Sequence, residues 1–79
     1  MTITVTARDI AMGKPKHPRS CPIALAMRHQ TSRGVFVDSD CIFLNEDRFS
    51  LPAKARRFIA LFDDGFDVSP MSFELEVPA

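Results

Sequence analysis

The chain has 79 residues, of which 46% are hydrophobic and 25% are charged. This is the composition of one small globular domain, which excludes disorder and fibrous repeats, and no apolar run reaches the roughly 18 residues that a membrane span needs. Ten basic and ten acidic side chains cancel, which excludes a simple polycation that binds nucleic acid and a simple polyanion that mimics DNA. We therefore expect a single domain covering residues 1–79.

The charges are unevenly placed along the chain. Residues 1–35 carry six basic side chains and one acidic one, whereas residues 36–79 carry four basic and nine acidic ones. A chain divided in this way presents one basic and one acidic surface, unless the two halves pair across the fold and the difference disappears. The sequence leaves both alternatives open.

The N-terminal segment alternates apolar residues with threonines. Ile3, Val5 and Ala7 alternate with threonines over residues 2–7, which predicts a half-buried strand. Thr6 stands three residues before Asp9, as in a capping box, and predicts a short helix that ends near Gly13. The segment has neither a basic leader nor the apolar core of a signal peptide, so we expect a cytoplasmic protein.

A basic loop and a second helix follow. Residues 14–19 contain two prolines and three cations, which predicts an exposed and partly stiffened loop. Ser20 or Cys21 as N-cap and Pro22 at the first helical position then predict a helix to about Gln30. Its first turns are apolar on every side, which is typical of a helix buried in the middle of a fold.

The middle of the chain is predicted to form a β-hairpin. Two short apolar runs, Val35–Val37 and Cys41–Leu44, flank a polar turn at residues 38–40, which is the pattern of two antiparallel strands. Residues 45–48 are predicted to form a second polar turn. Ser50, Leu51 and Pro52 are then expected to begin a third helix.

The third helix is amphipathic. Ala55, Phe58, Ile59 and Phe62 share one face, Asp63 and Asp64 end the helix, and Gly65 provides a left-handed residue after it. Phe73, Leu75 and Val77 alternate with polar residues and predict a closing strand. The expected fold is α+β, in the order β-α-α-β-β-α-β, with a mostly antiparallel sheet and helices packed on one face.

Catalytic and metal-binding groups are poorly represented. Cys21 and Cys41 are expected to be thiols, and a Cys21 nucleophile would need a base and an orienting group that the chain does not supply. The spacing of His17, Cys21, His29 and Cys41 matches no zinc pattern, and the aspartates around Gly65 are explained as a solvated helix end. We expect no catalytic residue, no metal, no cofactor and no enzyme activity.

Two charged surfaces are candidates for binding. The acidic candidate lies in the turns and at the end of the third helix and consists of Asp38, Asp40, Glu46, Asp47, Asp63, Asp64 and Asp67. The basic alternative flanks the second helix, where its residues are placed to converge on one end, and continues on the third: Lys14, Lys16, Arg19, Arg28, Arg33, Arg56 and Arg57. All seven aromatic residues are Phe, mostly at core positions, which weakens base stacking on nucleic acid.

Several short motifs together resemble a group of small phage and prophage proteins. They are Asp9-Ile10-x-x-Gly13, Cys21-Pro22-Ile23-Ala24-Leu25-Ala26, Leu51-Pro52, Phe58-Ile59, Phe62-Asp63-x-Gly65, Val68-x-Pro70 and Phe73. Within that group the chain is similar to the anti-CRISPR inhibitors of the type I-C surveillance complex, Cascade. The resemblance covers most of the chain and includes no catalytic motif.

The resemblance implies a stoichiometric mechanism. A monomer in the cytoplasm of a phage-infected or prophage-carrying bacterial cell would bind Cascade subunits and keep target DNA out. Because the DNA path of Cascade is lined by basic side chains, the acidic residues are the first choice of contact. The alternative is a small phage accessory protein that binds nucleic acid through the basic loop, and a thiol-based factor acting through Cys21 comes third.

Overall fold

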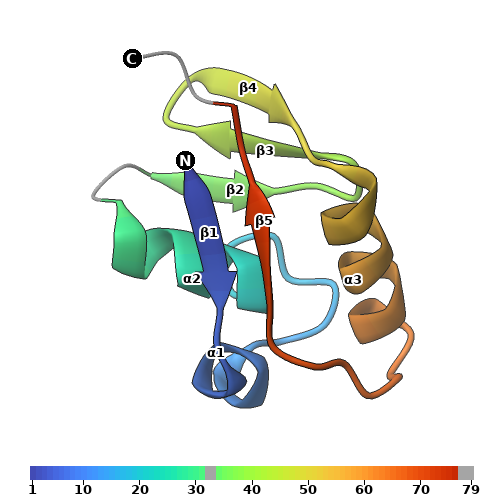
Figure 1. The fold of residues 1–79 in the computed structure, drawn as a ribbon. Coiled ribbons are helices and arrows are strands. Elements are labelled where there is room, and N and C mark those ends of the chain that lie inside the picture. The colour runs from blue at the N-terminus through green and yellow to red at the C-terminus, as the bar shows by residue number, and fades with distance from the viewer. Residues whose placement is uncertain (32–33, 77–79) are drawn as a thin grey trace.

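The computed structural model describes residues 1–31 and 34–76 (Figure 1). In chain order its elements are β1 (Thr2–Val5), α1 (Ala7–Met12), α2 (Pro22–Gln30), β2 (Val35–Val37), β3 (Cys41–Leu44), β4 (Asp47–Ser50), α3 (Ala53–Asp63) and β5 (Met71–Glu74). The α+β class is confirmed. The predicted strand residue Val77 and the basic candidate Arg33 lie outside the described residues. No helix of the described part is long and apolar enough to cross a membrane.

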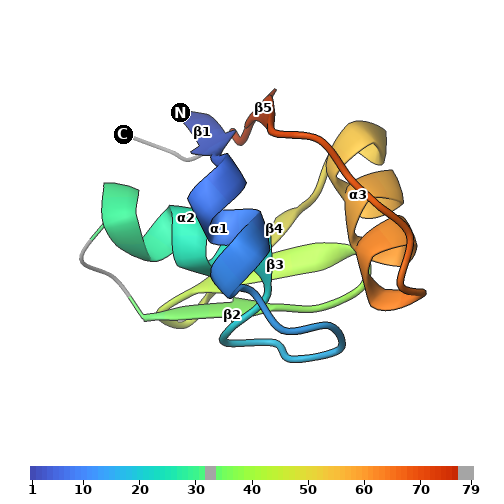
Figure 2. The same cartoon turned by 90° about the horizontal axis from the view of Figure 1, so that it is seen from below.

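Every strand pairing is antiparallel, as predicted, but the strands form two sheets. The first and last strands pair with each other, with Thr2 opposite Glu74 and Ile3 opposite Phe73. The other sheet has the order β2-β3-β4. Seen from below, the β1–β5 ribbon lies on one side of α2 and the three-stranded sheet on the other (Figure 2). The helix therefore separates the two sheets and serves both.

The strand β4 was not predicted. The sequence assigns residues 45–48 to a turn, whereas the structure confines the turn to Asn45 and Glu46 and begins a strand at Asp47. Asn45 adopts a left-handed conformation with φ 57°, which asparagine tolerates and which makes the turn tight. Since β4 is an edge strand, most of its side chains are exposed and polar, and this conceals the strand pattern.

The boundaries of α3 also differ slightly from the prediction. The helix begins at Ala53, and Pro52 is its extended N-cap residue with ψ 158°. It ends at Asp63, and Gly65 has φ 84°, which is the left-handed residue that the sequence predicts. The chain therefore turns sharply away from α3 toward β5.

The first two helices are capped as the sequence indicates. The Thr6 hydroxyl accepts a hydrogen bond from the Asp9 backbone N–H at 3.2 Å, and the Asp9 carboxylate accepts from the Thr6 N–H at 3.0 Å. Cys21 is the N-cap of α2, with Pro22 at the first position. Gly13 follows α1 with φ −71°, a conformation that any residue can adopt, so glycine is not needed there for a left-handed backbone. A Cβ there would lie 2.6 Å from the Pro22 side chain, so the close approach of the chain to α2 requires glycine.

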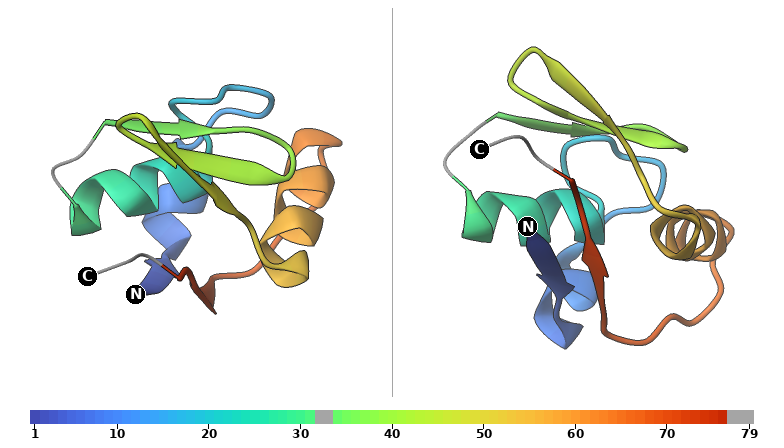
Figure 3. Two further views of the ribbon diagram at one scale, coloured as in Figure 1. Left: turned by 90° about the horizontal axis from the view of Figure 1, so that it is seen from above. Right: turned by 45° about the horizontal axis from the view of Figure 1, so that its top comes forward.

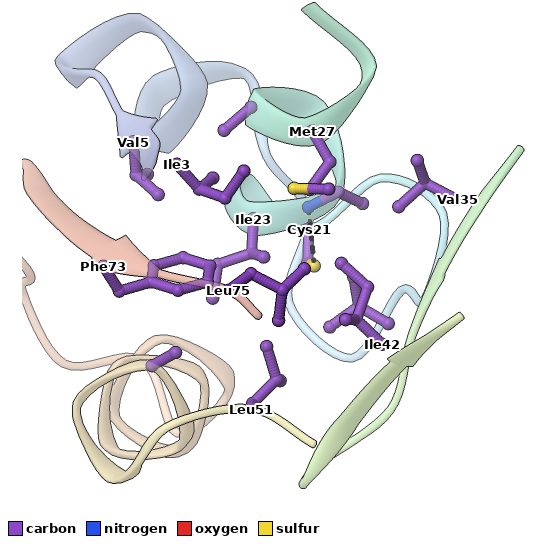
Figure 4. Close-up of a cluster of buried hydrophobic side chains, with 14 of the residues drawn as sticks. Ile3, Val5, Cys21, Ile23, Met27, Val35, Ile42, Leu51, Phe73 and Leu75 are labelled. Carbon is purple, nitrogen blue, oxygen red and sulfur yellow. Dashed lines mark hydrogen bonds between the residues drawn. The ribbon is translucent and has the colours of Figure 1, made fainter. Parts of the chain in front are cut away.

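The hydrophobic core is built around α2. Ile23, Ala24 and Met27 are fully buried on this helix. Figure 4 shows Ile23 and Met27 facing side chains from both sheets and from the segment before α3, among them Ile3, Ile42, Leu51, Phe73 and Leu75. The prediction that this helix lies buried inside the fold is confirmed. Its partners come from both ends of the sequence, so the termini must be in place before the core is complete.

Polar contacts hold the β1–β5 ribbon at the outer edge of β1 and across its two strands. The Gln30 side chain accepts a hydrogen bond from the Thr4 N–H at 3.0 Å and donates one to the Thr2 carbonyl at 3.2 Å, so its amide satisfies backbone groups at the free edge of β1. The Glu74 carboxylate accepts a hydrogen bond from the Thr2 hydroxyl. This bond, together with the N-terminal amine, lowers the pKa of Glu74.

Shortening Ile23 tests the role of α2 in the core. We expect Ile23→Ala to lower the free energy of unfolding by about 2–5 kcal/mol, because it leaves a cavity between the two sheets, and Ile23→Val to lower it by about 0.5–1.5 kcal/mol. Leu61→Ala is the control, since Leu61 is 39% exposed. Urea denaturation followed by circular dichroism measures all three. An equal loss for Ile23→Ala and Leu61→Ala would contradict the central role of α2.

Candidate interaction surface

The C-terminal end of α3 carries the densest group of acidic residues. Asp63 and Asp64 close the helix, and Asp67 follows three residues later, after the left-handed Gly65. Asp64 and Asp67 are exposed, and Asp63 is half-buried. The negative end of the helix dipole and three carboxylates therefore coincide at one corner of the molecule, which makes it a local centre of negative potential.

The same corner exposes an aromatic side chain. Phe66 is 61% exposed and Leu61 is 39% exposed. The Phe66 N–H donates to the Leu61 carbonyl at 2.9 Å, which keeps the two residues adjacent. We call Leu61, Asp63, Asp64, Phe66 and Asp67 the α3 corner. Exposed apolar side chains beside charged ones are typical of protein-protein contacts.

The remaining acidic candidates lie at opposite ends of β3. Asp38 and Asp40 flank the β2–β3 turn, and Glu46 and Asp47 lie at the β3–β4 turn. The structure brings Asp38 and Asp63 to one small cavity of about 160 Å³, although they are far apart in sequence. The predicted acidic set is therefore divided: the β2–β3 turn is joined to the end of α3, and the β3–β4 turn stands apart.

The basic loop lies against this acidic end. The Lys16 backbone N–H donates to the Asp63 carboxylate at 2.8 Å, with Lys16 in a left-handed conformation. Lys16 and His17 line the same cavity as Asp38 and Asp63. The two charged halves of the sequence therefore adjoin here and are not segregated. Neither of the two ion pairs within residues 1–31 and 34–76 involves a lysine or an arginine.

The basic candidates do not converge on one end of α2. Lys14, Lys16 and Arg19 precede its first turn, whereas Arg28 lies near its last turn. Arg56 and Arg57 are exposed on α3. Figure 3 shows the loop and the last turn of α2 on different sides of the molecule. The described basic residues thus form separate groups, and no continuous basic surface flanks this helix.

Cys21 is a capping residue with a buried thiol. It is 6% exposed, and its sulfur accepts a hydrogen bond from the Ala24 N–H at 3.4 Å. Burial raises the pKa of the Cys21 thiol, which opposes formation of the thiolate that a nucleophile needs. Cys21 and Cys41 are both free thiols, as the sequence predicts.

One group of side chains has ligand-like spacing in the described part of the chain. Oxygen and sulfur atoms of Asp38, Asp40 and Cys41 lie within 4.8 Å of one another. The Cys41 side chain, and to a lesser extent the carboxylates of Asp40 and Asp38, raise the pKa of Arg48. His17, Cys21 and His29 do not belong to this group.

The exposed Phe66 and Phe36 were missed by sequence reasoning. Phe36 is 39% exposed on the outer face of the three-stranded sheet. Its ring packs edge-on against Phe43, with 5.9 Å between the ring centroids. Side chains alternate between the two faces of a strand, so with Val35 and Val37 on the buried face, Phe36 between them is predicted to be exposed. Phe66 follows Gly65, outside any helical or strand period, and only its acidic neighbours mark it as a surface residue.

Known proteins provide no further guide to this surface. No family model, no curated protein and no solved structure matches the chain. The chemistry of the surface is therefore interpreted from its own side chains.

The raised pKa of Cys21 predicts a pH effect on stability. The unfolded thiol ionises near its ordinary value of 9.0, whereas the buried thiol keeps its proton, so the folded state loses stability as the pH rises above that value. We expect the stability difference between the wild type and Cys21→Ser to fall between about pH 7 and pH 10. Urea denaturation of both proteins measures this difference. A constant difference across the range would contradict the burial of the thiol.

Proposed function

We propose that the protein is a non-enzymatic binding protein that docks the α3 corner against a basic protein surface. The observation that carries the proposal is the 61% exposure of Phe66 among the carboxylates of the α3 corner. Small domains keep most large apolar residues inside, so an aromatic side chain exposed to this extent is available to a partner. A docked Phe66 buries apolar area, and the aspartates select a positively charged partner.

The partner that we propose is the type I-C Cascade complex. The chain resembles inhibitors of that complex, and the surface that we assign to binding has the charge that suits a DNA path lined by basic side chains. In this proposal the protein binds stoichiometrically, as a monomer in the bacterial cytoplasm, and occupies the path in place of target DNA. No chemical step is needed, because occupancy alone prevents DNA binding.

The competing proposal is nucleic-acid binding through the basic loop. Lys14, Lys16 and Arg19 are exposed, and side chains of this kind contact phosphates. Against it, the loop adjoins Asp63 and Asp38, whose charges repel a phosphate backbone. Binding of this kind weakens steeply with salt, which separates the two proposals experimentally.

The first experiment is a pull-down of the tagged protein from a lysate of a type I-C CRISPR host, with and without nuclease treatment. We expect Cascade subunits to be recovered in both samples. Purified Cascade mixed with the protein is then expected to lose binding of target DNA in a gel-shift assay. Recovery of nucleic acid alone, lost after nuclease treatment, would overturn the proposal in favour of the basic loop.

Charge reversal at matched pairs tests the contact surface. We expect Asp64→Lys with Asp67→Lys to weaken Cascade binding by about tenfold or more, because like charges then face each other across the interface. The matched control, Glu46→Lys with Asp47→Lys, makes the same change in net charge at the β3–β4 turn and is expected to change binding by less than about threefold. Biolayer interferometry measures both. Equal losses would show a general charge effect and contradict docking by the α3 corner.

Truncation of the exposed phenylalanines separates the apolar contribution from the charge contribution. Phe66→Ala is expected to weaken binding by about ten- to a hundredfold, as truncation of a buried interface aromatic does. Phe36→Ala is the matched control on the outer face of the sheet and is expected to leave binding unchanged. The reverse order would move the contact to the sheet.

A further inference from the structure

A second candidate site lies between α1 and α2. The two helices border a surface groove of about 490 Å³, lined by Thr6, Arg8, Asp9, Met12, Leu25 and His29. This is the size of a small-molecule site. None of its residues belongs to the α3 corner.

The floor of the groove contains a buried carboxylate. Asp9 is 2% exposed and is the one buried charged residue in the described part of the chain. One of its oxygens accepts hydrogen bonds from the Thr6 N–H and the Thr6 hydroxyl, both at 3.0 Å. Capping of α1 explains this oxygen completely. The other oxygen lies 3.2 Å from His29 Nδ1, which capping does not explain.

The contact with Asp9 orients His29. Its Nδ1 is used by the buried carboxylate, while the side chain as a whole is 66% exposed. A carboxylate that accepts from one imidazole nitrogen fixes the ring and leaves the other nitrogen for a ligand. Within residues 1–31 and 34–76, no residue forms a hydrogen bond with Nε2. The ring is therefore both fixed and accessible at the groove.

The other walls supply one cation and apolar surface. Arg8 is exposed, and its guanidinium has no ion pair among the described residues. Met12 is 65% exposed, and Leu25 is half-buried. A guanidinium beside apolar walls suits an anion that is attached to an apolar group, since guanidinium binds carboxylates with two parallel hydrogen bonds.

We propose that this groove binds a carboxylate carried on a small apolar group. Arg8 pairs with the carboxylate, His29 in its imidazolium form donates from Nδ1 to Asp9 and from Nε2 to the ligand, and Met12 and Leu25 contact the apolar part. The charge of the site favours a monoanion, because Asp9 offsets one of the two basic side chains and a dianion would be left with excess charge. The proposal is independent of Cascade binding.

The test uses benzoate as the probe and benzamide as its neutral counterpart of the same shape. NMR spectra of the labelled full-length protein report the Met12 methyl and the His29 ring. We expect benzoate to shift both signals saturably and benzamide to bind about tenfold more weakly or not at all. Equal binding of benzamide, or no saturable shift with benzoate, would overturn the proposal.

Variants separate a binding role from a structural one. Arg8→Gln and His29→Gln are each expected to weaken benzoate binding by about tenfold with an unchanged circular dichroism spectrum. Arg28→Gln is the matched control, because Arg28 is exposed on α2 and does not line the groove. If Arg28→Gln weakens binding as much as Arg8→Gln, the effect is that of net charge and the site does not exist.

Discussion

Burial of α2 between two small sheets is the interaction on which the rest of the structure depends. A two-stranded ribbon is at best marginally stable alone, and a small sheet needs its hydrophobic face covered. Both sheets gain this apolar contact from the same helix. The two sheets therefore share one core, with Ile23 and Met27 at its centre. Gly13 and Cys21 help to place α2 in this core. Gly13 permits the close approach of the chain to Pro22, and Cys21 caps the buried start of the helix.

The sequence predicts the elements of this core well because their signals are local. The Thr6–Asp9 box, Pro22 at a helix start and Gly65 after a helix end each act within a few residues. The division into two sheets depends on contacts between distant segments, such as Ile3 with Phe73, and no local pattern reports them. The edge strand β4 was missed for a related reason, since only Phe49 packs against the core and its neighbours are polar.

The sequence predicts which charged residues the candidate surface contains, but not how the fold arranges them in space. Counting residues separates a basic half from an acidic half, but the loop that holds Lys16 folds back onto Asp63, so the count overstates the separation in space. The end of α3 was identified through its aspartates alone. Exposure of Phe66 follows from the turn at Gly65, which directs the chain away from the core, and a periodic pattern carries no information about such a turn.

The placement of the two proposed sites follows from the same architecture. Because α2 is surrounded by the sheets and α1, polar chemistry on this helix is confined to its last turn, where Arg28, His29 and Gln30 emerge. Gln30 is committed to the edge of β1, and His29 is held by Asp9. In the α3 corner, Asp63 is the residue whose side chain accepts a hydrogen bond from the basic loop. A partner that docks there thus meets Phe66 and two aspartates whose carboxylates form no ion pair within residues 1–31 and 34–76, and the groove beside α1 contains none of these residues.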